Sequence, residues 1–274
     1  FDDPMGNGGI NSFGKTVTNY VDLNPANSLL DYNCGQITYN THQGTDIEIL
    51  NFYEMDEGVP ILCSAPGNVI YIHDGEYDRN TEWINGANAN AVIVSHSDGS
   101  EAWYLHMRKN SVNVELDDTV SVGDTLGYVG SSGYSSGPHI HFEIQQNGTV
   151  DPYSGNCQTD TSRWLEQGEY VSNLPFEVMD NGLTIIPLDW SMISERPPTK
   201  SHVTAPSTIY SWLRLRNVSS SDLLTWEFYA NGSVWNSYSF NPDDTYSSSW
   251  WYVYWNLPSD SSYYGDWEIK IFRN

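Results

Sequence analysis

The sequence has few basic residues, and this scarcity sets the charge of its surface. Only 11 Lys and Arg stand against 35 Asp and Glu among 274 residues, which gives a formal net charge of −24. A surface of this sign repels polyanions, so we expect neither nucleic acid nor anionic lipid as a partner. Salt screens such repulsion over about 10 Å or less, so a strongly acidic surface suits saline water outside a cell.

Long apolar stretches are also missing. No run approaches the roughly 20 consecutive apolar residues that a spanning helix needs, so we expect a chain that is not membrane-embedded. The chain opens at Phe1 without a basic and then apolar leader, which predicts a processed or trimmed form. The hydrophobic content of 39% is enough for a folded core.

Cysteine is scarce as well, at three residues: Cys34, Cys63 and Cys157. None lies in a CxxC pair, which argues against a cysteine-rich metal site. Three buried thiols are one interpretation. We favour one disulfide, and Cys34–Cys157 over the two other pairings, because these residues flank the segment with the most distinctive motifs. Such a bridge predicts an oxidising compartment.

Four segments follow one another along the chain. Residues 1–33 are rich in Asn, Gly and Asp and predict an irregular arm. Residues 34–157 contain short strand-like runs and the hairpin signal Asp98-Gly99, without a long helical period, and predict a compact antiparallel β domain. Residues 158–187 form a transition with a short helix expected at 162–168. The fold class is therefore mainly β.

The last segment, 188–274, differs in composition. Eight of the eleven tryptophans lie from Trp190 onward, in short alternating runs such as 224–229, 251–255 and 266–272. Asn231-Gly232 is a further hairpin signal. Strands of this length and spacing predict a small C-terminal β-sandwich, with most of the tryptophans in its core.

Three of the seven histidines fall into two short patterns. His42 and Asp46 stand four residues apart in a stretch whose glycine and β-branched neighbours predict a turn followed by a strand. His139, His141 and Glu143 alternate with apolar residues in the run Pro138-His139-Ile140-His141-Phe142-Glu143-Ile144. On a strand these three polar side chains share one face, because successive side chains point to opposite faces.

Two imidazoles and one carboxylate form a suitable ligand set for catalytic zinc, with a fourth position left for water. Zinc lowers the pKa of bound water to about 7 and polarises a carbonyl group. The HExxH motif with its glutamate base is absent, so remaining histidines must act as acid and base. His106, at the end of the run Trp103-Tyr104-Leu105-His106, is the best partner for the second histidine of the pair.

Together, His42-x-x-x-Asp46, Tyr104-x-His106 and Pro138-His139-x-His141-Phe142-Glu143 resemble the three motifs of the lysostaphin-type (LytM-like) zinc endopeptidases, over residues 35–152. The resemblance implies a β-fold with a groove across one sheet. It implies one Zn²⁺ held by His42, Asp46 and His141, and acid/base work by His106 and His139, with the general base left open between the two. It also implies a tyrosine that stabilises the oxyanion, for which Tyr39 is the candidate.

The function expected from this resemblance is a secreted bacterial zinc metalloendopeptidase that cleaves between small, Gly-rich residues, with the periplasm as a second location. Its partner would be a peptide polymer, most simply the cross-bridges of peptidoglycan, or alternatively a Gly-rich protein such as elastin. We expect a monomer. Two other classes remain open: a non-catalytic cell-wall-binding regulator, and a phosphocarrier on a related fold, which has no use for Asp46.

Overall fold

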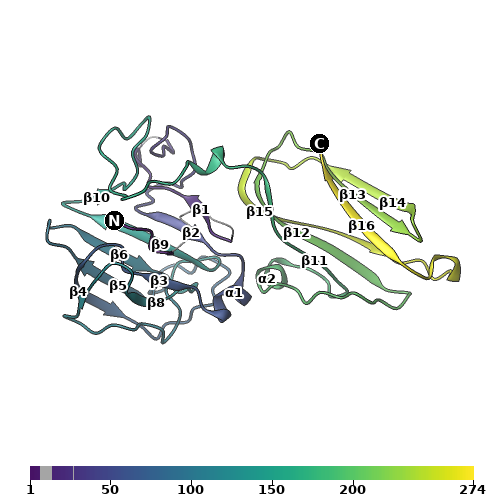
Figure 1. Cartoon of the computed structure of the whole chain (residues 1–274), viewed down its shortest axis with the longest axis horizontal. Coiled ribbons are helices and arrows are strands. Elements are labelled where there is room, and N and C mark those ends of the chain that lie inside the picture. Colours follow the sequence, from purple (N-terminus) through teal and green to yellow (C-terminus); the bar gives the residue numbers. More distant parts are fainter. Residues whose placement is uncertain (7–13, 27) are drawn as a thin grey trace. The chain divides into compact units, whose positions relative to one another are not determined.

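The computed structural model describes residues 1–6, 14–26 and 28–274. It contains two compact units, Phe1–Asn173 and Leu174–Asn274, which we treat separately. Their boundary lies within the segment 158–187. Regular structure in both units is nearly all strand (Figure 1), which confirms the prediction of a mainly β fold.

The first unit is built on one antiparallel sheet with the order β1-β2-β9-β6-β5-β4-β7, and β10 pairs with β9 outside this path. A separate small sheet pairs β3 with β8. The strands are β1 (Thr16–Asn19), β2 (Thr45–Glu48), β3 (Pro60–Leu62), β4 (Gly67–His73), β5 (Ala91–Ser95), β6 (Glu101–Leu105), β7 (Thr119–Val120), β8 (Thr125–Tyr128), β9 (His139–Gln145) and β10 (Thr149–Val150). Helix α1 (Phe52–Glu57) is capped by Asn51, whose side chain accepts a hydrogen bond from the Glu54 N–H. The short η1 (Val171–Asn173) ends the unit.

Strand β9 lies between β2 and β6, and its alternation follows the prediction. Ile140 and Phe142 are fully buried in the core, while His141 and Glu143 lie on the other face, where their side chains contact each other. Across the sheet, Asp46 of β2 pairs with His141, and His141 also pairs with Leu105 of β6. This register brings the ends of three strands to one place.

Two local expectations for this unit were wrong. The arm 1–33 is not irregular throughout, because its β-branched run Thr16–Asn19 forms β1 and pairs with β2. The segment 162–168 contains no helix. It is held instead by one buried indole, since Trp164 packs on Phe142 and Tyr153 at ring-centroid distances of 5.4 and 5.5 Å.

The favoured disulfide is confirmed. Cys34 and Cys157 are bonded, and the bridge closes a sequence separation of 123 residues. Cys63 is a free, buried thiol that donates to the carbonyl of Ala65. The bridge therefore joins the two ends of the segment that carries the histidine motifs.

The second unit is a β-sandwich, as predicted. One sheet has the order β11-β12-β15 and the other β14-β13-β16. The strands are β11 (Glu177–Thr184), β12 (Thr208–Val218), β13 (Leu224–Ala230), β14 (Ser233–Phe240), β15 (Tyr246–Asn256) and β16 (Trp267–Arg273), with α2 (Trp190–Ser194) and η2 (Ser261–Tyr263). Residues 177–184, expected within the transition, thus belong to the sandwich.

The sandwich core confirms the main expectation for the tryptophans. Trp226 is fully buried with Leu215 and Phe228, and Trp251 and Trp255 pack against the same cluster. Trp250 instead packs against a second cluster around Trp212. Neighbouring side chains on β15 thus serve opposite faces. Among the described residues, no helix is long and apolar enough to cross a membrane.

Candidate active site

Three side chains from distant parts of the first unit converge on one point. His42 Nε2 lies 3.2 Å from Asp46 Oδ1, and His141 Nδ1 lies 2.8 Å from the same oxygen. The two ring nitrogens are 3.1 Å apart. All three side chains are buried, and they form a group able to hold a metal ion. The structure therefore brings together the three residues predicted as metal ligands.

The fold explains this convergence. Asp46 and His141 are direct cross-strand partners on β2 and β9, whose side chains on one face stand about 5 Å apart. His42 precedes β2 in a tight turn in which Thr41 has a positive φ of 69°. Its Nδ1 lies 2.7 Å from the carbonyl oxygen of Tyr20. That nitrogen donates to the carbonyl, which leaves Nε2 as the ligand atom.

In His141 and Asp46, the side-chain atoms that point away from the centre also form hydrogen bonds. His141 Nε2 donates to Glu143 Oε1 at 2.9 Å, so Nδ1 faces Asp46 and His42. Asn19 Nδ2 donates to Asp46 Oδ2 at 3.0 Å, so Oδ1 faces the imidazoles. A hydrogen bond behind each ligand fixes its orientation and, for histidine, its tautomer. Neither Glu143 nor Asn19 was predicted to have a role here.

The donor set fits a single divalent cation. Tetrahedral zinc with bonds of about 2.0–2.1 Å separates its ligand atoms by roughly 3.3 Å. The three donor separations of 2.8, 3.1 and 3.2 Å lie close to that spacing. Two imidazoles and one carboxylate suit zinc among the common cations. Three ligands from the chain also leave a fourth position for a non-protein ligand.

The electrostatics of the centre favour positive charge. Burial opposes ionisation of Asp46, but the charge of His42 and the hydrogen bond from His141 hold its pKa well below the usual value. Burial likewise opposes protonation of His141, but its hydrogen bonds to Asp46 and Glu143 raise its pKa to about 9. Two carboxylates around one imidazole therefore favour positive charge at this position.

Two further histidines lie beside these three. The rings of His106 and His139 are 4.6 Å apart, and the ring of His106 is 5.7 Å from that of His141. His106 donates through Nδ1 to the carbonyl of Ser132 at 2.7 Å, and His139 donates through Nδ1 to the carbonyl of Gly137 at 2.8 Å. In both rings Nδ1 is therefore the protonated nitrogen, and Nε2 is left to act on a substrate; Nε2 of His139 lies 3.6 Å from Asp46 Oδ1.

His106 occupies an unusual backbone position. It follows the last residue of β6 and has a φ of 64°. This left-handed conformation is uncommon for residues other than glycine, and such residues often lie at functional sites. Burial, then the charges of His139 and His141, hold its pKa well below that of a free histidine. His106 is therefore uncharged near pH 7.

Tyr39 lies at the mouth of this centre. Its ring is 4.3 Å from that of His42, and 45% of the residue is exposed. Burial and the charge of Asp46 raise the pKa of its phenol, so it remains a hydrogen-bond donor. Tyr134, which also influences Tyr39 electrostatically, stacks on Trp83 at 6.2 Å. Both Trp83 and Tyr134 are exposed.

Gly44 is required by close packing rather than by backbone conformation. A Cβ at this position would lie 2.6 Å from His141 Nε2 and 2.7 Å from the carbonyl oxygen of Phe142. A real Cβ does not approach other atoms so closely, so any larger residue would displace His141. Glycine between His42 and Asp46 is thus part of the site.

The remaining histidines lie outside the centre. His73 pairs with Glu76, His96 contacts the carbonyl of Pro66, and His202 contacts Ser201. Among the described residues, His42, Asp46 and His141 are the group of potential ligands that the geometry brings together.

The segment that carries this site is similar to known peptidases. Residues 40–152 match the model of Peptidase family M23, which confirms the resemblance inferred from the motifs. The glycyl-glycine endopeptidase ALE-1 of Staphylococcus capitis is 29% identical over 53% of this chain and 35% of its own length. The DD-carboxypeptidase/endopeptidase Mpg of Neisseria meningitidis is 32% identical over 43% of this chain and 23% of its own length. The chain thus spans about a third or less of these relatives.

Among solved structures, the catalytic domain of lysostaphin from Staphylococcus simulans is similar at 26% identity. The match covers 41% of this chain and 77% of that one, with a TM-score of 0.32. A zinc containing peptidase from Vibrio cholerae matches at 25% identity over 42% of this chain and 30% of that one, with a TM-score of 0.32. Both TM-scores are low, so the similarity rests on the sequence of residues 40–152.

Proposed function

We propose that this chain, whose residues 40–152 match Peptidase family M23, is a zinc metalloendopeptidase that cleaves peptide bonds between small residues. The observation that carries the proposal is the convergence of His42, Asp46 and His141, with two more imidazoles beside them. When bound, zinc would supply an activated water and a polarised substrate carbonyl. His42, Asp46 and His141 would hold it.

The residues around the ligands supply the rest of the chemistry. His106 and His139 each donate a hydrogen bond from Nδ1 to a backbone carbonyl, which leaves Nε2 as the nitrogen that exchanges a proton with the substrate. Nε2 of His139 lies 3.6 Å from Asp46 Oδ1. We assign to this pair the removal of the proton from water and its delivery to the leaving amine. The general base remains open between the two; the lowered pKa of His106 keeps that imidazole uncharged near pH 7.

Tyr39 would stabilise the oxyanion that develops during hydrolysis. Its phenol remains protonated and lies beside His42, so it is able to donate a hydrogen bond to that oxygen. Replacement of Tyr39 by Phe removes this donor and keeps the ring. It should lower kcat and leave the affinity for metal unchanged.

We propose glycine-rich peptide as the substrate class, with the cross-bridges of peptidoglycan as the natural source. Support comes from the two relatives named as endopeptidases, one of them specific for glycyl-glycine. A glycine-rich protein such as elastin has the same chemistry at the cleaved bond. The Cys34–Cys157 bridge supports a secreted protein, since disulfides persist in oxidising compartments.

The test is digestion of pentaglycine, purified peptidoglycan and elastin, with the new termini read by mass spectrometry. We expect cleavage between glycines that stops with a chelator and returns with zinc. Glycine-rich bridges cut in peptidoglycan, with elastin left intact, would identify the cell wall as the source. If neither polymer nor peptide is cleaved by zinc-loaded protein, the chain is a binding or regulatory module and the proposal is wrong.

A further inference from the structure

The sandwich of the second unit has four edge strands, and they differ in charge. Strands β11 and β16 carry charged residues, among them Asp180 on β11 and Lys270 on β16. The other two edges, Ser233–Phe240 (β14) and Tyr246–Asn256 (β15), contain no Asp, Glu, Lys or Arg. Proteins commonly protect free edges with charge, because an unprotected edge pairs with other chains. Two of the four edges lack this protection.

The two uncharged edges lie next to each other. Phe240 of β14 and Trp251 of β15 have ring centroids 5.0 Å apart, and Trp235 and Trp255 stand at 6.4 Å. Neither β14 nor β15 has a second strand partner in the part of the chain that the structure describes. The unprotected edges therefore form one continuous side of the sandwich.

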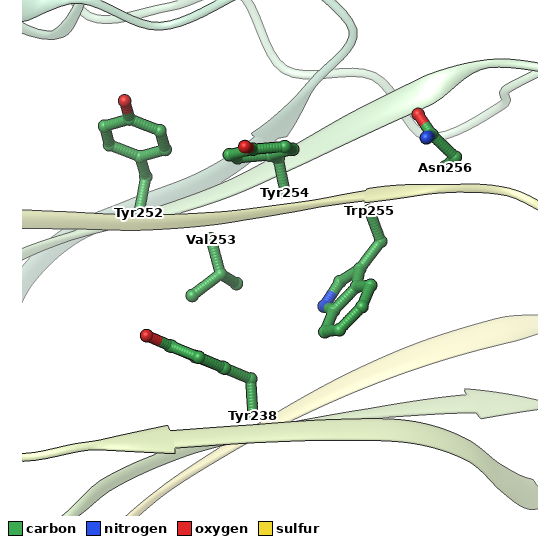
Figure 2. A pocket seen from close by; sticks show the side chains of 6 residues that line it. All are labelled: Tyr238, Tyr252, Val253, Tyr254, Trp255 and Asn256. Carbon is green, nitrogen blue, oxygen red and sulfur yellow. The ribbon is translucent and has the colours of Figure 1, made fainter.

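A space of about 490 Å³ opens on this side (Figure 2). It is lined by Tyr238 of β14 and by five consecutive residues of β15, Tyr252, Val253, Tyr254, Trp255 and Asn256. The volume is typical of a ligand site. Every lining side chain is uncharged.

The lining residues show where this space lies relative to β15. Figure 2 shows Tyr252 and Tyr254 on one side of the strand, and Val253 and Trp255 on the other, directed toward Tyr238. A binding surface on one face of a sheet would be lined by every second residue of β15, since successive side chains point to opposite faces. A space lined by consecutive residues of both faces lies beside the strand, where backbone N–H and C=O groups without a partner strand are directed.

We propose that the free edge of β15 binds an extended, uncharged peptide, which adds to the sheet as a further strand beside Tyr252–Asn256. Backbone hydrogen bonds supply affinity in such strand addition, and pockets for alternate side chains supply selectivity. The choice of a glycine-rich peptide as the occupant rests on the proposed function, because the same polymer would then be held by the second unit and cleaved by the first.

Charge and shape favour this occupant. A chain with a net charge of −24 repels acidic peptides, and the lining offers no carboxylate to a basic one. A glycan stacks on rings of one face, so the two-sided lining favours a peptide.

The test measures binding of a dye-labelled, neutral peptide of Gly-Gly-Ser repeats, about ten residues long, to the full chain by fluorescence anisotropy. The protein carries His141→Ala, so that the peptide is not consumed. The edge is altered by Tyr254→Lys, at a residue 61% exposed, with Tyr252→Lys as a second variant. Phe272→Lys is the matched control, because Phe272 is 40% exposed on the charged edge β16.

We expect Tyr254→Lys and Tyr252→Lys to weaken binding at least about tenfold, and Phe272→Lys to leave it within about twofold. Hydrogen exchange should show new protection of amides in 252–256 when the peptide is added, because paired N–H groups exchange slowly. Equal binding by all variants, or no new protection, would overturn the proposal.

Two other occupants are separate outcomes, and each would also overturn it. A soluble neutral glycan that binds in competition with the peptide, without amide protection, would identify a sugar site. A concentration-dependent dimer that dissociates in the Tyr254→Lys variant would identify a second copy of the chain as the occupant of this edge. Hydrolysis of pentaglycine, measured in parallel on the chain with His141 intact, separates the two proposals. If that chain does not hydrolyse pentaglycine but the peptide still binds at the edge of β15, only the proposed function is contradicted.

Discussion

Glu143 Oε1 accepts a hydrogen bond of 2.9 Å from Nε2 of His141, two residues earlier on the same strand. Because β9 is extended, both side chains project from one face, and the carboxylate holds the imidazole with Nδ1 directed at Asp46 and His42. The strand thus supplies a proposed metal ligand together with the group that orients it. Several measurable consequences depend on this arrangement.

Replacement of Glu143 by Gln should weaken metal binding about 10- to 100-fold, as is common for groups that orient a metal ligand. The amide is close in size to the carboxylate but lacks its charge, so it no longer favours a cation at the site. Competition with a zinc-binding dye measures the change. Glu101→Gln, at the start of β6, serves as the control, since Glu101 accepts from Trp103 away from the centre. Equal zinc affinity in both variants would contradict the role given to Glu143.

Replacement of Gly44 by Ala should abolish most of the activity without unfolding the chain. The new Cβ would meet His141 Nε2 and the backbone of Phe142 at less than 3 Å, so the ligand has to move. A displacement of about 1 Å at a catalytic group costs on the order of 100-fold in rate. Peptide hydrolysis and thermal unfolding, measured together, separate the site from the fold.

Gly86→Ala is the control for that experiment. A Cβ at Gly86 meets nothing within 4 Å, although its φ of 77° strains any larger residue. This variant should lose a little stability and keep its activity. A Gly44→Ala protein as active as the Gly86→Ala protein would show that His141 tolerates the added methyl group.

Asp151 should make the stability of the fold depend on pH. Burial raises its pKa to about 7, and its Oδ2 is buried without a partner among the described residues. An acid with a raised pKa binds its proton more tightly in the folded state. Its stabilising effect is therefore complete below the unfolded pKa near 4 and is lost as pH rises to about 7.

The expected slope is up to about −1.4 kcal/mol of unfolding free energy for each pH unit between those values. Urea unfolding at pH 5, 6, 7 and 8 measures it. Asp151→Asn removes the titrating group. The free energy of unfolding of the variant should therefore rise relative to that of the wild type as pH rises. A constant difference across this range would show that Asp151 does not titrate there.

Loss of the Cys34–Cys157 bridge should destabilise the first unit by about 2–5 kcal/mol. The bridge spans 123 residues, so it restricts a large loop of the unfolded chain. Urea unfolding of a Cys34→Ser, Cys157→Ser variant measures the effect. Reduction of the wild type should reproduce it. Cys63→Ala is the control, because it removes a free thiol and leaves the bridge in place. The stability of this variant should still fall when reducing agent is added.

The sequence predicted much of this molecule because its signals were local. Alternation in 139–144 placed His141 opposite the buried Phe142, and Asn231-Gly232 formed the expected turn with positive φ at both residues. The mainly β fold and the sandwich followed from such runs. The disulfide followed from the positions of Cys34 and Cys157 around the motifs.

What the sequence did not predict depends on contacts between distant residues. Nothing near Asn19 in the sequence indicates that its amide holds Asp46, because the contact forms only when β1 pairs with β2. The helices at 52–57 and 190–194 have five or six residues, too few to show a period. The role of Glu143 could have been predicted, since alternation along the strand placed its side chain beside that of His141. The groove across one sheet and the monomeric state stay predictions.

The central claim is that His42, Asp46 and His141 hold one metal ion while His106 and His139 act on the substrate. The most direct measurement is zinc content by mass spectrometry, with pentaglycine hydrolysis measured on the same samples of wild type, His141→Ala and His106→Ala. We predict about one zinc for each wild-type chain, no retained zinc and no activity for His141→Ala, and retained zinc with at least about 100-fold slower hydrolysis for His106→Ala. Wild-type protein that binds no zinc, or a His141→Ala variant that keeps both metal and activity, would contradict the account.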